Sequence, residues 1–401
     1  MLEELFYLHK KAVEGVPLTF KRYLYDDISW GSHCLCISGA RGVGKTTLLL
    51  QHFQERYGDV EKCLYISADN IEIAALGLLN TAKEYFKYGG HALIIDEVHK
   101  YPGWQIELKN ILDTFKDKKI LFSASSSLKL QEGKADLSRR AVYYHLKGLS
   151  FREYLELKEE IKLQGYPLKD LLTGHVNIVQ GAISGMPILK HFRDYLVYGY
   201  YPFFKEGEKT YLPKVLNTIE KVLYEDIAAL GNMKRSNIQA LKKMLWVVAT
   251  SVPFTVNIDK MSRELHLSKE YVYTYLEYLE GAGLVSSLRS DAKGYKLARK
   301  PEKLFMENTN LLFAINNYLR SESEQGMVRE TFFVNQLKDI TKIAPGDAGD
   351  FVVDGKYHFE VGGKGKDFKQ LKGLKNAYVV ADRIEIGQGN KIPLYLFGFL
   401  Y

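Results

Sequence analysis

The sequence predicts a doubly wound α/β fold with a parallel sheet, followed by a helical region and a small α/β domain. Short apolar runs alternate with helix-length segments between Leu35 and His145, a glycine-rich motif follows the first run, and the alternation stops after Leu149. Continuous apolar runs are typical of parallel strands that are buried on both faces. Strands that alternate with helices indicate a doubly wound sheet.

Five apolar runs are expected to form the strands of this sheet. They cover residues 35–37, 63–66, 92–95, 120–122 and 142–144. Helices are expected between them, as over residues 46–57 and 103–116.

The composition is that of a globular chain. Its 401 residues are 46% hydrophobic and 26% charged, which allows two to four domains of ~100–200 residues each. The net charge of +7 permits a nucleic-acid partner without requiring one. Cys34, Cys36 and Cys63 lie in apolar runs and cannot form a disulfide framework, so we expect a reducing, cytoplasmic location. No apolar run approaches the ~18 residues that cross a bilayer, so no membrane association is expected.

The glycine-rich motif fits the pattern G-x-x-x-x-G-K-[ST] without a mismatch. It follows an apolar strand and opens a helix, which argues against a chance glycine-rich turn. The glycines let backbone N–H groups face phosphate oxygens at the helix N-terminus. The predicted nucleotide-binding residues are Gly39, Ala40, Arg41, Gly42, Val43, Gly44, Lys45, Thr46 and Thr47.

Catalytic roles follow from this motif and from the end of a later strand. Lys45 is expected to contact the β- and γ-phosphates of ATP, and the Thr46 hydroxyl to bind Mg²⁺. Asp96 would hold the Mg²⁺ shell and Glu97 would orient or deprotonate the attacking water. Alternatively, the two carboxylates cap the helix that follows. Ser123, at the end of the next strand, would sense the γ-phosphate or place the water, unless it belongs to a plain polar turn.

These segments resemble the prokaryotic AAA+ family ATPases that carry a C-terminal region of unassigned function. The resemblance rests on GARGVGKTT at 39–47, ALIIDEVHKYP at 92–102, FSASS at 122–126 and LSRRAVYYHLKGLSFREY at 137–154, and it continues over GYYP at 199–202. It implies a P-loop ATPase fold with ATP and Mg²⁺ as cofactors. Arg140 aligns with a family arginine, whereas Arg139 stands where the family usually has glycine.

Arg140 is a candidate for stabilising the charge that develops in phosphoryl transfer, in cis or from a neighbouring subunit. A trans role would require a homo-oligomer. The alternative is a surface arginine that pairs with acidic neighbours.

Four regions are expected along the chain: a P-loop AAA+ core over 1–148, a helical lid or connector over 149–210, a winged-helix region over 211–320, and a restriction-endonuclease-like domain over 321–401. The winged helix is inferred from a helix at 258–265, a turn, a helix at 269–280 and a hairpin with strands at 284–288 and 296–299. Basic residues on the hairpin would contact DNA phosphates, or the module would only pack against a partner domain.

The tail carries acids in the order expected of a restriction-endonuclease-like core. Glu330 lies early in a helix, Asp350 opens a strand and Glu360 lies on the return strand of an Asp354-Gly355 hairpin. Glycine occupies the usual lysine position, so Lys364, or Lys369 on the following helix, would have to substitute. An inactive nucleic-acid-binding or structural relic is favoured over a working nuclease or an unrelated α/β tail.

The function expected from the sequence is ATP hydrolysis with Mg²⁺ that drives conformational change in C-terminal modules, which contact DNA or a protein partner. Two alternatives are an ATP-regulated DNA nuclease and a nucleotide-dependent signalling scaffold with little turnover.

Overall fold

The computed structural model describes residues 2–125, 137, 139–228, 233–251, 254–290 and 301–401. The chain divides into two compact units, Met1–Gly148 and Leu149–Tyr401. The three C-terminal regions expected from the sequence all lie within the second unit. No helix among the described residues is both long and apolar enough to span a bilayer.

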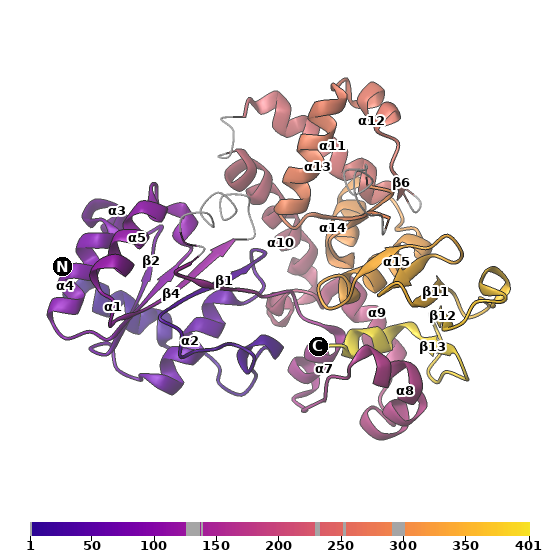
Figure 1. Ribbon diagram of the computed structural model, residues 1–401, viewed down its shortest axis with the longest axis horizontal. Helices are drawn as coiled ribbons and strands as arrows, with labels where there is room; N and C mark the ends of the chain where they lie inside the picture. Colours follow the sequence, from indigo (N-terminus) through magenta and orange to yellow (C-terminus); the bar gives the residue numbers. More distant parts are fainter. Residues whose placement is uncertain (1, 126–136, 138, 229–232, 252–253, 291–300) are drawn as a thin grey trace. The chain divides into compact units, whose positions relative to one another are not determined.

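The N-terminal unit is built on a five-stranded sheet in the order β2-β3-β4-β1-β5, in which all neighbouring strands are parallel (Figure 1). Its strands are β1 (Cys34–Gly39), β2 (Cys63–Ser67), β3 (Ala92–Asp96), β4 (Lys119–Ser125) and β5 (Val142–His145). Each contains one of the predicted runs, so the five strands and the doubly wound sheet are confirmed. The order places β1, which leads into the glycine-rich motif, between β4 and β5.

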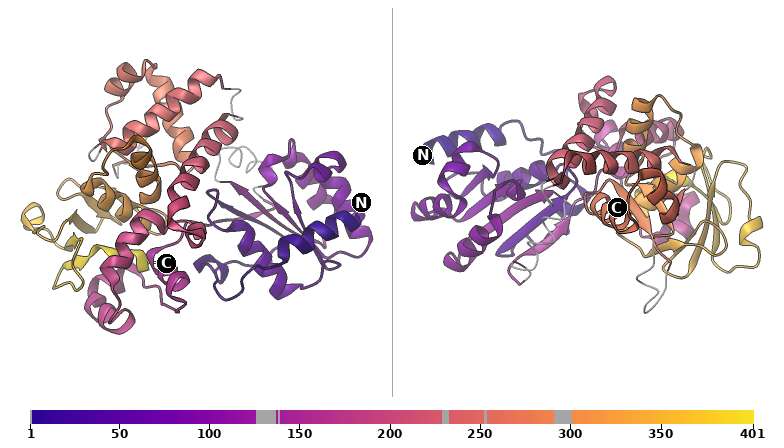
Figure 2. Two further views of the ribbon diagram at one scale, coloured as in Figure 1. Left: turned by 180° about the vertical axis from the view of Figure 1, so that it is seen from behind. Right: turned by 90° about the horizontal axis from the view of Figure 1, so that it is seen from above.

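Helices cover both faces of this sheet, as Figure 2 shows. They are α1 (Leu2–Val13), α2 (Lys45–Arg56), α3 (Ile71–Leu76), α4 (Leu78–Lys87) and α5 (Trp104–Thr114), with 3-10 turns η1 (Tyr23–Tyr25) and η2 (Val98–Lys100). One face packs its alternate residues, such as Cys36, Leu93 and Phe122, with α3, α4 and α5 in a single apolar core. Helix α2 contacts β1 and β4. Burial on both faces explains why the strands are continuous apolar runs.

Strand β5 differs from the expectation that all five strands are buried. It forms the edge of the sheet beside β1, and its side chains are exposed or half-buried, with Val142 43% exposed. An edge strand has only one neighbour, so its side chains have fewer contacts.

The C-terminal unit begins with a helical part in which Ser150 caps α7 through a capping box with Glu153. Its helices are α7 (Phe151–Glu159), α8 (Leu168–Ala182), α9 (Ile188–Tyr198), α10 (Glu208–Lys221), α11 (Arg235–Thr250), α12 (Ile258–Leu265), α13 (Lys269–Gly281), α14 (Thr309–Leu319) and α15 (Gln325–Leu337), with a π-helix η4 (Val222–Ile227) and 3-10 turns η3 (Pro202–Glu206), η7 (Lys369–Leu371) and η8 (Leu394–Phe399).

Two sheets complete this unit. A three-stranded antiparallel sheet has the order β6-β8-β7, and a five-stranded mixed sheet has the order β13-β12-β11-β10-β9. The strands are β6 (Phe254–Thr255), β7 (Val285–Leu288), β8 (Lys303–Met306), β9 (Ile343–Pro345), β10 (Phe351–Val353), β11 (Tyr357–Gly362), β12 (Ala377–Ala381) and β13 (Lys391–Pro393).

The helices and first strand expected for a winged helix are present, and the Ser268 side chain caps α13 by accepting the Tyr271 N–H. The strand that pairs with β7 is β8, which begins at Lys303. The expected return strand at 296–299 and its turn at 293–295 lie outside the described residues. The winged helix therefore stays a prediction.

Asp354 and Gly355 lie in the turn that joins the antiparallel strands β10 and β11, and both have positive φ, 53° and 62°. Val353 pairs with Tyr357, so Lys356 also belongs to the loop, and the hairpin is one residue longer than a two-residue turn.

Candidate nucleotide site

The predicted phosphate loop joins the end of β1 to the first turn of α2. Gly39, Gly42 and Gly44 all have positive φ, at 152°, 86° and 98°, a region that favours glycine. The Lys45 side chain is buried and folds back over the loop, where Nζ donates to the carbonyl oxygens of Gly39 at 3.0 Å and Ala40 at 3.1 Å. The loop thus surrounds a buried cation at a helix N-terminus, which is the chemistry of a phosphate site.

Gly39 is required at its position for a steric reason as well. A Cβ atom built there would lie 2.3 Å from the carbonyl oxygen of Leu146, on the segment that follows β5. The loop is therefore in contact with this segment through backbone atoms, and no larger residue fits.

Asp96, at the end of β3, is the centre of a hydrogen-bond cluster. Its Oδ2 accepts from Thr46 Oγ1 at 2.6 Å and from the Tyr65 hydroxyl at 3.0 Å, and its Oδ1 accepts from the Ser123 hydroxyl. Burial, followed by the Asp96 carboxylate, raises the pKa of Tyr65, so this phenol stays protonated and donates. Asp96 and Thr46 are thus paired, as two residues that share the coordination shell of one ion would be.

Glu97 lies beside this pair in a left-handed backbone conformation, with φ of 52°. One carboxylate oxygen is 3.8 Å from Lys45 Nζ and the other is 3.5 Å from His99 Nε2. His99 Nδ1 accepts from the backbone N–H of Ser125 at 3.3 Å. In a neutral imidazole whose Nδ1 accepts, the proton is on Nε2, so His99 presents an N–H to Glu97.

Ser123 lies within the site, but its contacts differ from those expected of a γ-phosphate sensor. The side chain is fully buried, its hydroxyl donates to Asp96, and it accepts the Glu97 backbone N–H at 2.9 Å. These bonds make Ser123 a residue that fixes the two acids relative to each other.

Arg140 is not brought to this cluster within one chain. It precedes β5, whose first residue Val142 pairs with Leu35, four residues before Gly39. At ~3.3 Å per residue, roughly 13 Å of strand separates that level from the loop. The guanidinium forms a bidentate ion pair with Asp113 at the end of α5, in which Nε donates to Oδ1 at 3.0 Å and Nη2 donates to Oδ2 at 3.2 Å. Within one chain Arg140 therefore lies at the edge of the sheet where the strands begin, away from the phosphate loop.

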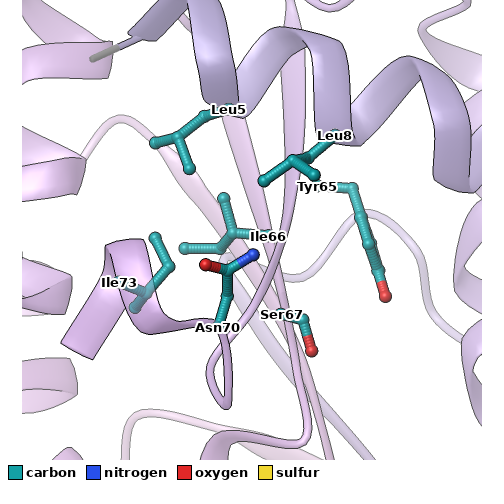
Figure 3. Close-up of a pocket in the computed structure, with 7 residues that line it drawn as sticks. All are labelled: Leu5, Leu8, Tyr65, Ile66, Ser67, Asn70 and Ile73. Atoms are coloured by element: carbon teal, nitrogen blue, oxygen red, sulfur yellow. The ribbon is translucent and has the colours of Figure 1, made fainter.

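A cavity of about 180 Å³ lies beside the site, between α1 and β2 (Figure 3). It is too small for a nucleotide, since ligand pockets have volumes of ~300–1,000 Å³. Tyr65 lines this cavity and also bonds to Asp96. The other lining residues are Leu5, Leu8, Ile66, Ser67, Asn70 and Ile73.

The acids expected in the tail lie near one another in the C-terminal unit. Glu330 pairs with Lys303 at 3.3 Å, and the Asp350 carboxylate accepts from the Val361 N–H at 2.8 Å. Burial, and next the Asp350 charge, raises the pKa of Glu330 to about 7, against the opposing effect of Lys303. Burial also raises the pKa of Glu360.

The lysine partner of Glu360 differs from the one expected. Lys366 forms the ion pair with the fully buried Glu360, whereas Lys364 is exposed. Lys369 instead pairs with Asp367 at 3.0 Å. The part of the chain that the structure describes holds no group of three His, Cys, Asp or Glu side chains placed to bind a metal ion.

Sequence patterns gave no indication of Tyr65, His99 or the buried Arg22. Arg22 and Tyr65 contact the site from positions 21 and 31 residues away in the chain, whereas His99 is a near neighbour of Glu97. Only His99 lies within a stretch that the family resemblance already singled out.

Two family models match segments of the chain. Residues 31–155 match a family model described as an AAA domain, and residues 189–322 match a domain of unknown function, DUF8612. The uncharacterized protein MJ1637 of Methanocaldococcus jannaschii is 25% identical over 283 residues, which cover 67% of this chain and 59% of that protein. An uncharacterized protein of Haemophilus influenzae is 24% identical over 291 residues, 69% of this chain and 67% of its own length. The chain therefore spans less than two thirds of the length of MJ1637.

Among solved structures, AMPPCP-bound DnaA from Aquifex aeolicus has 16% identity and a TM-score of 0.28, covering 69% of this chain and 87% of that one. A replication initiator DnaA bound to AMPPCP and single-stranded DNA gives a TM-score of 0.27, with 17% identity over 68% of this chain and 87% of that one. Such scores are too low to establish a shared overall fold. The AAA domain rests on the match over residues 31–155 and on the parallel sheet with its phosphate loop.

Proposed function

We propose that the chain hydrolyses ATP with Mg²⁺ at the site formed by the phosphate loop, Asp96 and Glu97. The observation that carries the proposal is the 2.6 Å bond between Thr46 and Asp96, with Lys45 and Glu97 beside it. Hydroxyl and carboxylate oxygens are the ligands that Mg²⁺ prefers. The residues present therefore fit this ion, and Thr46 and Asp96 would hold it.

Each residue has a role in the proposed reaction. Backbone N–H groups of the loop bind the β-phosphate, and Lys45 exchanges its loop carbonyls for phosphate oxygens. Bound Mg²⁺ would neutralise charge on the β- and γ-phosphates. Glu97, which lies 3.5 Å from His99 Nε2, orients a water molecule and accepts its proton. Ser123 and Tyr65 keep the Asp96 carboxylate in place.

Phosphate release by purified protein tests this proposal. Lys45→Ala should reduce nucleotide affinity, and Glu97→Gln should retain binding but lower turnover by at least about 100-fold, since general bases contribute 10²–10⁴. Lys109→Ala and Glu72→Gln, which alter exposed residues of the same unit, serve as matched controls. Turnover that survives both site variants unchanged would contradict the proposal.

The C-terminal unit is proposed to change conformation with the nucleotide state and to contact DNA or a protein partner. If this unit binds DNA, its affinity for DNA should fall steeply as the salt concentration rises from about 50 to about 200 mM, because phosphate contacts release counterions. Titrating labelled duplex and single-stranded DNA with and without nucleotide measures this. An affinity independent of salt and nucleotide would favour a protein partner.

A DNA nuclease is the second candidate, supported by the gathering of Glu330, Asp350 and Glu360 near Lys303 and Lys366. Against it, no three acids of the described residues are arranged for a metal ion. Plasmid cleavage with Mg²⁺ or Mn²⁺ that is lost in Glu360→Ala would establish it. Without such cleavage, the tail is a binding or structural domain.

A further inference from the structure

Arg22 contacts the phosphate loop from outside the motif. The side chain is buried, with 5% exposure, and lies just before η1. Its Nη1 donates to the carbonyl oxygen of Val43, in the middle of the loop. Its Nη2 donates to the carbonyl oxygens of Lys147 at 2.8 Å and Gly148 at 2.9 Å.

The bond to Val43 fixes the orientation of one peptide group of the loop. No peptide bond among the described residues is cis, and in a planar trans peptide the C=O and the next N–H point in opposite directions. Because Arg22 holds the Val43 carbonyl on the outside, the Gly44 N–H is turned to the opposite side. That N–H belongs to the N-cap residue of α2, where a phosphate would bind.

The other two bonds reach the segment that leaves the N-terminal unit. Lys147 and Gly148 are its last residues. The same segment already contacts the loop, because the Leu146 N–H donates to Ser38 at 2.8 Å and the Leu146 carbonyl lies against Gly39. One guanidinium thus joins the middle of the phosphate loop to the residues that precede the second unit.

The position of Arg22 depends on α2 itself. Gln51 of α2 donates to the carbonyl oxygens of Pro17 at 2.6 Å and Phe20 at 2.8 Å. This fixes the segment that carries Arg22 to the helix that follows the loop. Arg22 therefore lies next to a segment that is hydrogen-bonded to the helix at the C-terminal end of the loop.

We propose that Arg22 is a positioning residue that aims the phosphate loop and couples its occupancy by nucleotide to the exit segment 146–148. A planar guanidinium suits this role, because it presents separate N–H groups to the two sides at once, whereas a lysine ammonium is a point charge. The inference rests on the proposed nucleotide site and extends it to communication along the chain.

Hydrogen exchange on the full chain without nucleotide is the first test. In Arg22→Lys, amides 40–45 and 146–148 should exchange faster together, by about tenfold or more, because hydrogen bonds to a charged group are lost. Exchange in α5 should stay unchanged, and Arg56→Lys, at an exposed arginine of α2, should alter neither segment. Arg22→Gln provides a second variant. Wild-type rates in both segments, or acceleration that spreads equally to α5, would overturn the proposal.

The second test adds Mg²⁺ and a slowly hydrolysed ATP analogue at saturation. In the wild type, exchange should slow in both segments, whereas in Arg22→Lys it should slow in the loop alone, with affinity reduced about tenfold. If the wild type binds the analogue by calorimetry and segment 146–148 does not respond, the coupling is refuted. If the wild type gives no heat of binding, the proposed function fails, while the nucleotide-free comparison still decides the role of Arg22.

Discussion

Replacing Glu330 by Gln should remove one contribution to the pH dependence of stability in the C-terminal unit. Glu330 is 6% exposed, and its pKa is raised to about 7 from the ordinary value of 4.5. Between these values the folded state binds more protons than the unfolded state, so stability falls as pH rises. A shift of about 2.5 units at 1.36 kcal/mol each corresponds to about 3 kcal/mol, all of it lost by about pH 8. The amide of the Glu330→Gln variant has no proton to lose in this range.

Urea unfolding at pH 5 and pH 8 measures this effect. Trp246 is the only tryptophan of the C-terminal unit, so its fluorescence in a Trp30→Phe, Trp104→Phe background reports that unit. Between the two pH values the free energy of unfolding should drop by about 2–3 kcal/mol more with Glu330 than with Glu330→Gln, in which other buried acids such as Glu360 still titrate. Glu322→Gln, at an exposed position nearby, should behave as the parent. Equal pH dependence in the parent and Glu330→Gln would refute the reasoning.

Two further predictions concern the nucleotide site. Tyr65→Phe should raise the Mg²⁺ concentration for half-maximal phosphate release about tenfold, because a hydrogen bond to a carboxylate is lost. Tyr88→Phe, at an exposed tyrosine, is its control. An unchanged dependence of phosphate release on Mg²⁺ in Tyr65→Phe would exclude Tyr65 from the site. Gly39→Ala should weaken calorimetric ATP binding by more than about tenfold, because the added Cβ meets the Leu146 carbonyl. Gly89→Ala is the control, because Gly89 also has positive φ but an added Cβ there would meet no atom within 4 Å. An equal loss of ATP affinity in both variants would point to backbone strain and not to the clash with Leu146.

The sequence was sufficient to predict the sheet and most of its site because both depend on local patterns. Apolar runs identify strands buried on two faces, and the motif at Gly39–Thr46 requires its glycines wherever it occurs. Asp96 and Glu97 could be placed because the carboxyl ends of parallel strands share one edge. No side chain from elsewhere was needed for these assignments.

The contacts of Arg22 and Tyr65 could not be predicted in this way. Arg22 reaches residues 21 and 125 positions away, and Tyr65 reaches Asp96 only because β2 and β3 are neighbours in the sheet. Lys366 was missed for a different reason. Lys364 would lie on the same face as Glu360 only if the strand continued, whereas β11 ends at Gly362 and a turn from Gly363 brings Lys366 back to Glu360.

The position of Arg140 gives a prediction about assembly. The acids and the loop lie where the strands end, whereas Arg140 lies where β5 begins, so it can serve a γ-phosphate only in another subunit. Lys45→Ala and Arg140→Ala should each be nearly inactive. Mixed in equal amounts and allowed to exchange subunits, they should regain about a quarter of wild-type turnover, because half of the sites have Lys45 and half of those face an intact Arg140. Lys45→Ala mixed with the double variant should regain nothing. If Arg140→Ala alone keeps wild-type turnover, the guanidinium serves only its bond to Asp113.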